Sequence, residues 1–117
     1  MSEESERRTA RRFHTIAPCL LRISGKEGHF EGSIQNIGQH GAFIKPDVVL
    51  PTEIVGCDAD LLIFDPNIPT RTLIKSSGKI VHEGDDGIGF YMRSMDSQSF
   101  SQLKMLLEQE IKRSNDR

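Results

Sequence analysis

Stretches in which apolar and polar residues alternate, or in which β-branched and aromatic residues cluster, recur along most of the chain. Such runs are typical of short β-strands when glycine, proline and aspartate separate them. We predict six strands, at Thr15–Ser24, Phe30–Ile37, Ala42–Ile44, Ile54–Phe64, Thr72–His82 and Ile88–Met92. Six strands in a chain of 117 residues favour a small closed barrel, because closure leaves no exposed sheet edge.

The last part of the chain has a different periodicity, which predicts a helix. Four apolar residues recur there at the spacing of one helical face, namely Phe100, Leu103, Leu107 and Ile111. Asp96 or Ser97 can cap the start of this helix, and Ser99 with Gln102 has the spacing of a capping box. An apolar stripe needs an apolar partner, so we expect the helix to pack against an open end or flank of the barrel.

The composition fits one soluble globular domain, with 36% hydrophobic and 27% charged residues. No apolar run approaches the roughly 20 residues that cross a bilayer, and the N-terminus lacks the apolar core of a secretory signal. The two cysteines, Cys19 and Cys57, form no CxxC pair, so we expect free thiols. We therefore predict a cytoplasmic protein with no membrane partner.

Charge is distributed unevenly along the chain, although the formal net charge is only −2. Four arginines fall close together in a stretch almost without apolar residues: Arg7, Arg8, Arg11 and Arg12. We expect residues 1–12 to form a flexible arm and residues 13–114 to form the barrel domain with its helix. The near-neutral total argues against long nucleic acids, whose affinity grows with the number of phosphate contacts.

The sequence lacks the motifs of common catalytic and metal sites. The four histidines show no HxxxH or HExxH spacing; they are His14, His29, His40 and His82. Asp85 and Asp86 stand between two glycines, where they fit a turn better than acid–base catalysis. No GxSxG, P-loop or Rossmann fingerprint occurs. We therefore expect neither an enzyme nor a bound metal or cofactor.

Two segments could bind an anionic nucleotide. The arginine cluster offers planar forks that fit phosphate oxygens and can donate twice to guanine O6 and N7. A solvated basic tail is the alternative interpretation of the same residues. Asn36, Gly38 and Gly41 stand at the junction of two predicted strands. They either form a bulged or tight turn or bring the backbone close to a ligand.

Together, these two segments resemble the PilZ domain, a family of bacterial cyclic di-GMP receptors. The family signature is RxxxR in a mobile N-terminal segment, followed by [D/N]xSxxG at a strand junction. The stretch Glu6–Phe13 resembles the first motif, with Arg8 and Arg12 as the motif pair and Arg7 before them. Arg7 with Arg11 also satisfies RxxxR, but the apolar residue directly after Arg12 favours the first register.

The second motif is occupied by Asn36, Gly38 and Gly41, and Gly38 replaces the motif serine. In the family this hydroxyl helps to bind the ligand, so its loss removes a polar contact, and we expect binding to survive but to weaken. The later stretches Gly78–His82 and Gly87–Phe90 are similar to the closing hairpin of the family. His82 lies where many relatives place a Trp or an Arg near the ligand.

The resemblance implies a mainly β fold, a six-stranded antiparallel PilZ-type β-barrel with a C-terminal α-helix and a flexible N-terminal arm. It implies a cyclic di-GMP site on the outer barrel surface, with the arm folding over the ligand. The implied ligand-binding residues are Arg7, Arg8, Arg12, Asn36, Gly38, Gly41 and His82. Because no second domain follows, we expect a stand-alone monomeric receptor that changes conformation and signals to a separate downstream protein.

Two other functions remain open. A PilZ-like adaptor that no longer binds nucleotide would act through protein contacts, and Gly38 is its main support. A small-barrel nucleic-acid binder would use the basic arm, but that mode of binding needs stacking aromatic residues. The chain has one tyrosine and no tryptophan. We assign its six phenylalanines to the core, namely Phe13, Phe30, Phe43, Phe64, Phe90 and Phe100.

Overall fold

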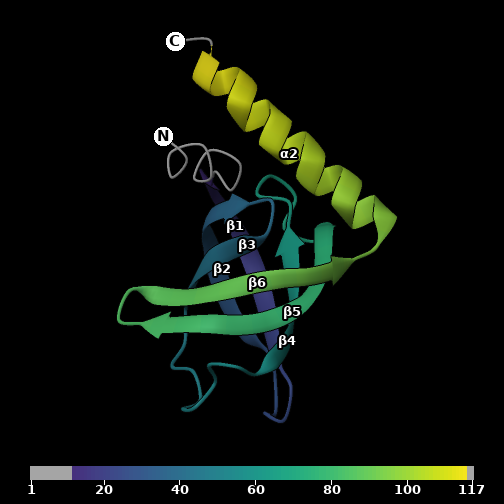
Figure 1. Ribbon diagram of the computed structural model, residues 1–117. Helices are drawn as coiled ribbons and strands as arrows, with labels where there is room; N and C mark the ends of the chain where they lie inside the picture. The colour runs from purple at the N-terminus through teal and green to yellow at the C-terminus, as the bar shows by residue number, and fades with distance from the viewer. Residues whose placement is uncertain (1–11, 116–117) are drawn as a thin grey trace.

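Six strands and one helix make up the described part of the chain (Figure 1). The computed structural model describes the backbone of residues 12–115 and the side chains of residues 17–109. In chain order the elements are β1 (Arg12–Ile23), β2 (Phe30–Gly38), β3 (Gly41–Pro46), β4 (Asp58–Phe64), β5 (Thr72–Gly84), β6 (Gly87–Met95) and α2 (Ser97–Asn115). Residues 1–11 of the predicted arm lie outside the described residues. The last residue of the predicted arm, Arg12, is the first residue of β1.

The strands close into one barrel in the order β1-β2-β3-β6-β5-β4. Every neighbouring pair is antiparallel, and β1 pairs with β4 to complete the ring. The mainly β fold predicted from the sequence, a closed six-stranded barrel with one C-terminal helix, is therefore confirmed. Within the described residues, no helix has the length and apolar character needed to cross a membrane.

Alternate residues of each strand point into the barrel and form one apolar core. On β1 they are Ala17, Cys19, Leu21 and Ile23; on β6 they are Ile88, Phe90 and Met92. Several irregularities interrupt the strand register, and two of them bear on the surface described below, one between Ile34 and Asn36 of β2 and one between Ile80 and His82 of β5. Each bulge inserts one residue, so the outward-facing positions change parity beyond it.

The fourth strand begins later than the sequence predicts, at Asp58 instead of Ile54. Ile54 is fully buried, but it lies in a turn before the strand. The Cys57 amide donates to the Ile54 carbonyl at 3.0 Å, and the Gly56 amide donates to the Ile80 carbonyl at 2.7 Å. The apolar character of Ile54 therefore reflects burial under the barrel end and not a place in the sheet.

The phenylalanines are less buried than predicted. Phe90 is 1% exposed and belongs to the core, but Phe100 is 50% exposed. Phe43 and Phe64 are half-buried, and Phe30 packs partly buried against the core. The assignment of all six to the core is therefore wrong, because outward positions on the strands also carry aromatic rings. The side chain of Phe13 lies outside the described residues.

The helix α2 is capped by Asp96, one of the two predicted capping residues. The Ser99 amide donates to Asp96 Oδ1 at 2.7 Å, as an N-cap requires. The Ser99 hydroxyl accepts a hydrogen bond from the Lys75 amide of β5 at 2.9 Å, which fixes the helix start against the barrel. Figure 1 shows the helix leaving the end of β6 and lying outside one end of the barrel.

The buried face of α2 differs in part from the predicted stripe. Leu103 is 1% exposed, and Leu106 and Leu107 pack partly buried against the core. Phe100 lies in the first helical turn, and half of its surface remains accessible. Leu103 and Leu107 were therefore predicted correctly, Leu106 joins the buried face, and Phe100 is covered only in part. The side chain of Ile111 lies outside the described residues.

Candidate functional site

Strand register aligns the end of the arginine motif with the second motif. The backbone of Arg12 in β1 pairs with Gly38 in β2. Ile37 of β2 pairs with Ala42 of β3. Continuing that register by one position sets Gly38 opposite Gly41 across a two-residue turn. Because Ile37 and Ala42 point into the core, both glycines belong to the outer face of the barrel.

A second row of outward positions runs parallel to the first. Asn36 of β2 pairs with Phe43 of β3, which in turn pairs with Gly89 of β6. Gly89 pairs with His82 of β5. Two bulges put Asn36 and His82 in this outward row. The structure therefore places Asn36, Gly38, Gly41 and His82 on one outer surface over β2, β3, β6 and β5.

Three glycines form the floor of this surface. Gly38, Gly41 and Gly89 are buried although their positions face outward, while His82 is exposed and Phe43 half-buried. A methyl group on Gly89 would come within 3.1 Å of His82 Cβ, so the histidine stands directly beside this floor. Buried glycines below taller side chains let a ligand approach the backbone closely.

The geometry separates two interpretations of the second motif. A bulge does occur in β2, directly before Asn36. In the described residues, however, the glycines with φ in the left-handed region are Gly25, Gly28, Gly56 and Gly87. Gly38 and Gly41 are not among them, so backbone conformation does not require glycine at either position. What these two glycines provide is the lack of a side chain.

The turn between the two motif glycines borders a small cavity. The Met92 amide donates to the His40 carbonyl at 2.9 Å, which ties the turn to β6. A cavity of about 310 Å³ lies beside it, lined by Gln39, His40, Met92, Arg93, Ser94, Met95 and Phe100. Phe100, in the first turn of α2, therefore lines the same cavity as Gln39 and His40 of the second motif.

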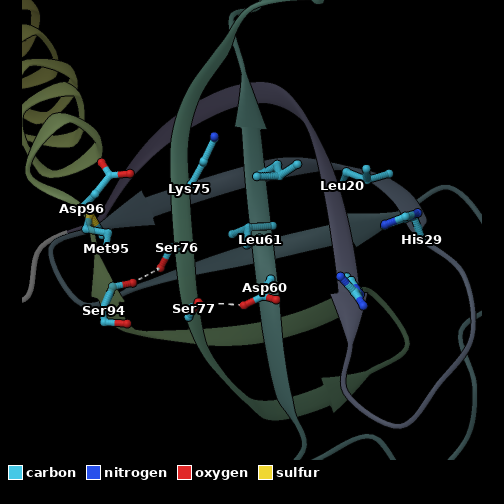
Figure 2. Close-up of a pocket in the computed structure, with 12 residues that line it drawn as sticks. Leu20, His29, Asp60, Leu61, Lys75, Ser76, Ser77, Ser94, Met95 and Asp96 are labelled. Atoms are coloured by element: carbon cyan, nitrogen blue, oxygen red, sulfur yellow. Dashed lines mark hydrogen bonds between the residues drawn. The ribbon is translucent and has the colours of Figure 1, made fainter.

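A larger cavity lies on another part of the barrel. Its volume is about 540 Å³, and residues of β1, β4 and β5 line it together with the segment that leads into α2 (Figure 2). The Ser77 hydroxyl donates to Asp60 Oδ1 at 2.7 Å, and Figure 2 marks this hydrogen bond with a dashed line. Asn36, Gly38, Gly41 and His82 do not line this cavity. Its lining mixes both signs of charge without a motif that would select a ligand.

Burial makes one of the two cysteine thiols hard to ionise. Burial raises the pKa of the Cys19 thiol to about 12, with a smaller contribution from the negative charge of Asp47, so the thiol stays protonated. Cys19 and Cys57 are both free thiols. Among the described side chains, those of residues 17–109, no group of three or more His, Cys, Asp or Glu could hold a metal ion.

This surface carries two aromatic residues that the sequence did not place there, Phe43 and Tyr91. Tyr91 lies directly opposite Gly41 and is 47% exposed. The signal was present in the alternation of β6, because the apolar residues Ile88, Phe90 and Met92 occupy the inward positions and leave Tyr91 outward. Phe43 could not be placed in the same way, because its neighbours Ala42 and Ile44 are also apolar and the three-residue pattern does not show which of them faces outward.

Comparison with known proteins agrees with this architecture. The model of the PilZ domain family matches residues 6–109. The chain belongs to the PilZ domain family. The match includes the arginine motif and the second motif, and it ends within α2. PilZ domains form a family of bacterial cyclic di-GMP receptors, and they are binding and regulatory domains.

A solved structure supports the PilZ fold independently. The chain is similar to the crystal structure of the PilZ domain of CeSA from a cellulose-synthesizing bacterium, with a TM-score of 0.63 and 15% sequence identity. The match covers 86% of this chain and 99% of the other. No curated protein matches the chain. At this identity the likeness establishes the barrel and its helix.

Proposed function

We propose that this PilZ protein binds cyclic di-GMP on the outer surface formed by Asn36, Gly38, Gly41 and His82. The observation that carries the proposal is the pairing of Arg12 with Gly38, which brings the arginine motif of β1 against the second motif of β2. A ligand above the glycine floor would therefore lie within reach of both motifs. PilZ membership of the chain supports the choice of ligand.

Each motif residue has a chemical role in this proposal. Arg8 and Arg12 clamp phosphates and guanine edges, because a guanidinium fork matches two acceptors at once, and Arg7 adds positive charge. Asn36 offers an amide to the edge of a guanine base. His82 stands beside Gly89, where its ring can contact a bound base. The glycines admit the nucleotide close to the backbone.

Ligand binding is proposed to reorder the arginine segment and to signal the bound state to a separate protein. Four arginines close together repel one another until an anion binds, so the ligand favours one arrangement of the segment. A partner that recognises this arrangement or the covered surface would read the signal. Trypsin cleavage after Arg7 and Arg8 should then slow when cyclic di-GMP is added; unchanged cleavage at saturating ligand would reject the reordering.

Calorimetric titration with cyclic di-GMP tests the binding itself. The unmodified protein should release or absorb heat with a saturable isotherm, and Arg8→Ala and Arg12→Ala should each weaken binding. A charge-assisted hydrogen bond contributes about 1.5–3 kcal/mol, which corresponds to about ten- to 150-fold in affinity. Arg71→Ala is the matched control, because Arg71 is exposed and pairs with Asp65 at 3.9 Å outside this surface.

The outcomes separate the two functions of a PilZ domain. Binding that is lost in the motif variants and kept in Arg71→Ala supports the receptor. Absence of heat at high micromolar protein would reject it and favour the adaptor that acts through protein contacts alone.

A further inference from the structure

The outer face of the barrel carries an aromatic side chain that belongs to neither motif. Tyr91 of β6 is 47% exposed, whereas its chain neighbours Phe90 and Met92 are 1% and 6% exposed. Phe90 and Met92 therefore point into the core, and the phenol ring of Tyr91 points outward. A large aromatic ring at a half-exposed strand position is available to a ligand.

Two outward neighbours of Tyr91 are glycines. Gly41 lies directly across on β3, and Gly89 lies two residues before it on β6, on the same face. Neither residue has a side chain that could cover the ring. On the opposite side, Lys79 of β5 pairs with Tyr91 and is half-buried. Tyr91 thus forms a wall beside the glycine floor, and the cationic residue Lys79 lies on its other side.

The position of this wall matches the proposed ligand site. Gly41 belongs to the second motif, and Gly89 pairs with His82, so Tyr91 and His82 border the same floor from two directions. A guanine base is flat, so it can lie close to a floor without side chains and stack on an aromatic ring. The surface beside Tyr91 provides both.

We infer that Tyr91 is a further ligand residue of this surface, and that its ring stacks on a guanine base of cyclic di-GMP held above Gly41. The inference rests on the proposed function. Stacking does not depend on base edges, so Tyr91 contributes affinity, while the arginine forks and Asn36 select the guanine. A tyrosine that served only the fold would be insensitive to the ligand.

The composition of the chain provides a specific reporter for this contact. Tyr91 is the single tyrosine of a sequence without tryptophan, so the tyrosine emission of the whole protein comes from this residue. A stacked guanine quenches that emission. Titration with cyclic di-GMP should lower it, with a midpoint that matches the calorimetric dissociation constant. N-acetyltyrosinamide at the same nucleotide concentrations corrects for light absorbed by the ligand.

Two substitutions test whether the ring itself matters. Tyr91→Ala should weaken binding by about tenfold or more, the lower part of the range for a base stacked on an aromatic ring. Tyr91→Phe keeps the ring and should bind within about twofold of the unmodified protein, measured by calorimetry. Met105→Ala is the matched control, because Met105 is similarly exposed at 52% but lies on α2. Thermal unfolding of each variant checks that the barrel remains folded.

The results distinguish this inference from the proposed function. Calorimetric binding with quenched emission and a weakened Tyr91→Ala supports both. Calorimetric binding with unchanged emission, or with full affinity in Tyr91→Ala, would overturn the inference and leave the cyclic di-GMP site in place. Absence of binding heat in the unmodified protein would reject the proposed function and the inference with it.

Discussion

Replacement of Gly38 by serine should restore the hydroxyl that the second motif of PilZ domains carries. Gly38 lies at the end of β2, opposite Arg12 and, across the turn, Gly41. Its φ lies outside the left-handed region, so a serine can adopt the same backbone without conformational strain. The substitution should therefore add a hydroxyl to the ligand surface without backbone strain.

The expected gain follows from the strength of a single hydrogen bond. One such bond contributes about 0.5–1.5 kcal/mol net, so Gly38→Ser should tighten cyclic di-GMP binding by about two- to twelvefold. Glycine within a strand also lowers stability by roughly 0.5–1 kcal/mol relative to alanine, because the unfolded chain loses more freedom on folding. The serine variant should therefore unfold at a slightly higher urea concentration as well.

Gly38→Ala separates the hydroxyl from the added carbon. Both variants should gain stability in urea unfolding, but only Gly38→Ser should gain affinity in calorimetric titration. An affinity that is equal to or weaker than that of the unmodified protein, in a variant that remains folded, would refute our account of the missing serine. An equal gain in Gly38→Ala would show that the hydroxyl is not the cause.

The docking of α2 gives two further predictions. Leu103→Ala should lower the free energy of unfolding, measured by urea titration, by about 2–5 kcal/mol, because Leu103 is 1% exposed. The exposed Met105 should tolerate alanine within about 0.5 kcal/mol. Equal losses in the two variants would contradict the docked helix. Hydrogen bonds from the Ser99 amide and, to a lesser extent, the Ser99 hydroxyl lower the pKa of Asp96 in the folded protein. The cap therefore stabilises the fold fully above the pKa of an unfolded aspartate, about 4, and this contribution is lost as the pH falls through the lower pKa of the folded state. Asp96→Asn keeps a capping side chain without titration, so its unfolding free energy should fall less than that of the unmodified protein between pH 5 and pH 2, and parallel curves would be inconsistent with the cap.

The order of the elements could be predicted from local pattern. Turn residues mark the strand ends, as at Asp85 and Asp86, which form the predicted hairpin turn between β5 and β6. A change from alternation to helical spacing marks α2. The late start of β4 could not be predicted in this way, because the burial of Ile54 under the barrel end imitates the apolar character of a strand.

The outward surface depends on register, which the sequence does not specify locally. Bulges before Asn36 and before His82 change which positions face outward, and a bulge has no reliable local signature. Phe43 was predicted to lie in the core for a different reason: Ala42, Phe43 and Ile44 are all apolar, so the sequence does not show that Phe43 alone faces outward. The motif residues were predicted by resemblance, and the pairing of Arg12 with Gly38 sets the last residue of the first motif beside the second motif.

The central claim is that cyclic di-GMP binds above the glycine floor of β2, β3 and β6. An amide NMR titration of the 15N-labelled protein measures this most directly, because every glycine of the floor carries a backbone amide. The account predicts that the largest shifts occur at Gly38, Gly41 and Gly89. Shifts centred instead on Asp60 and Ser77, in the larger cavity of β4 and β5, or no shifts at saturating ligand, would contradict it.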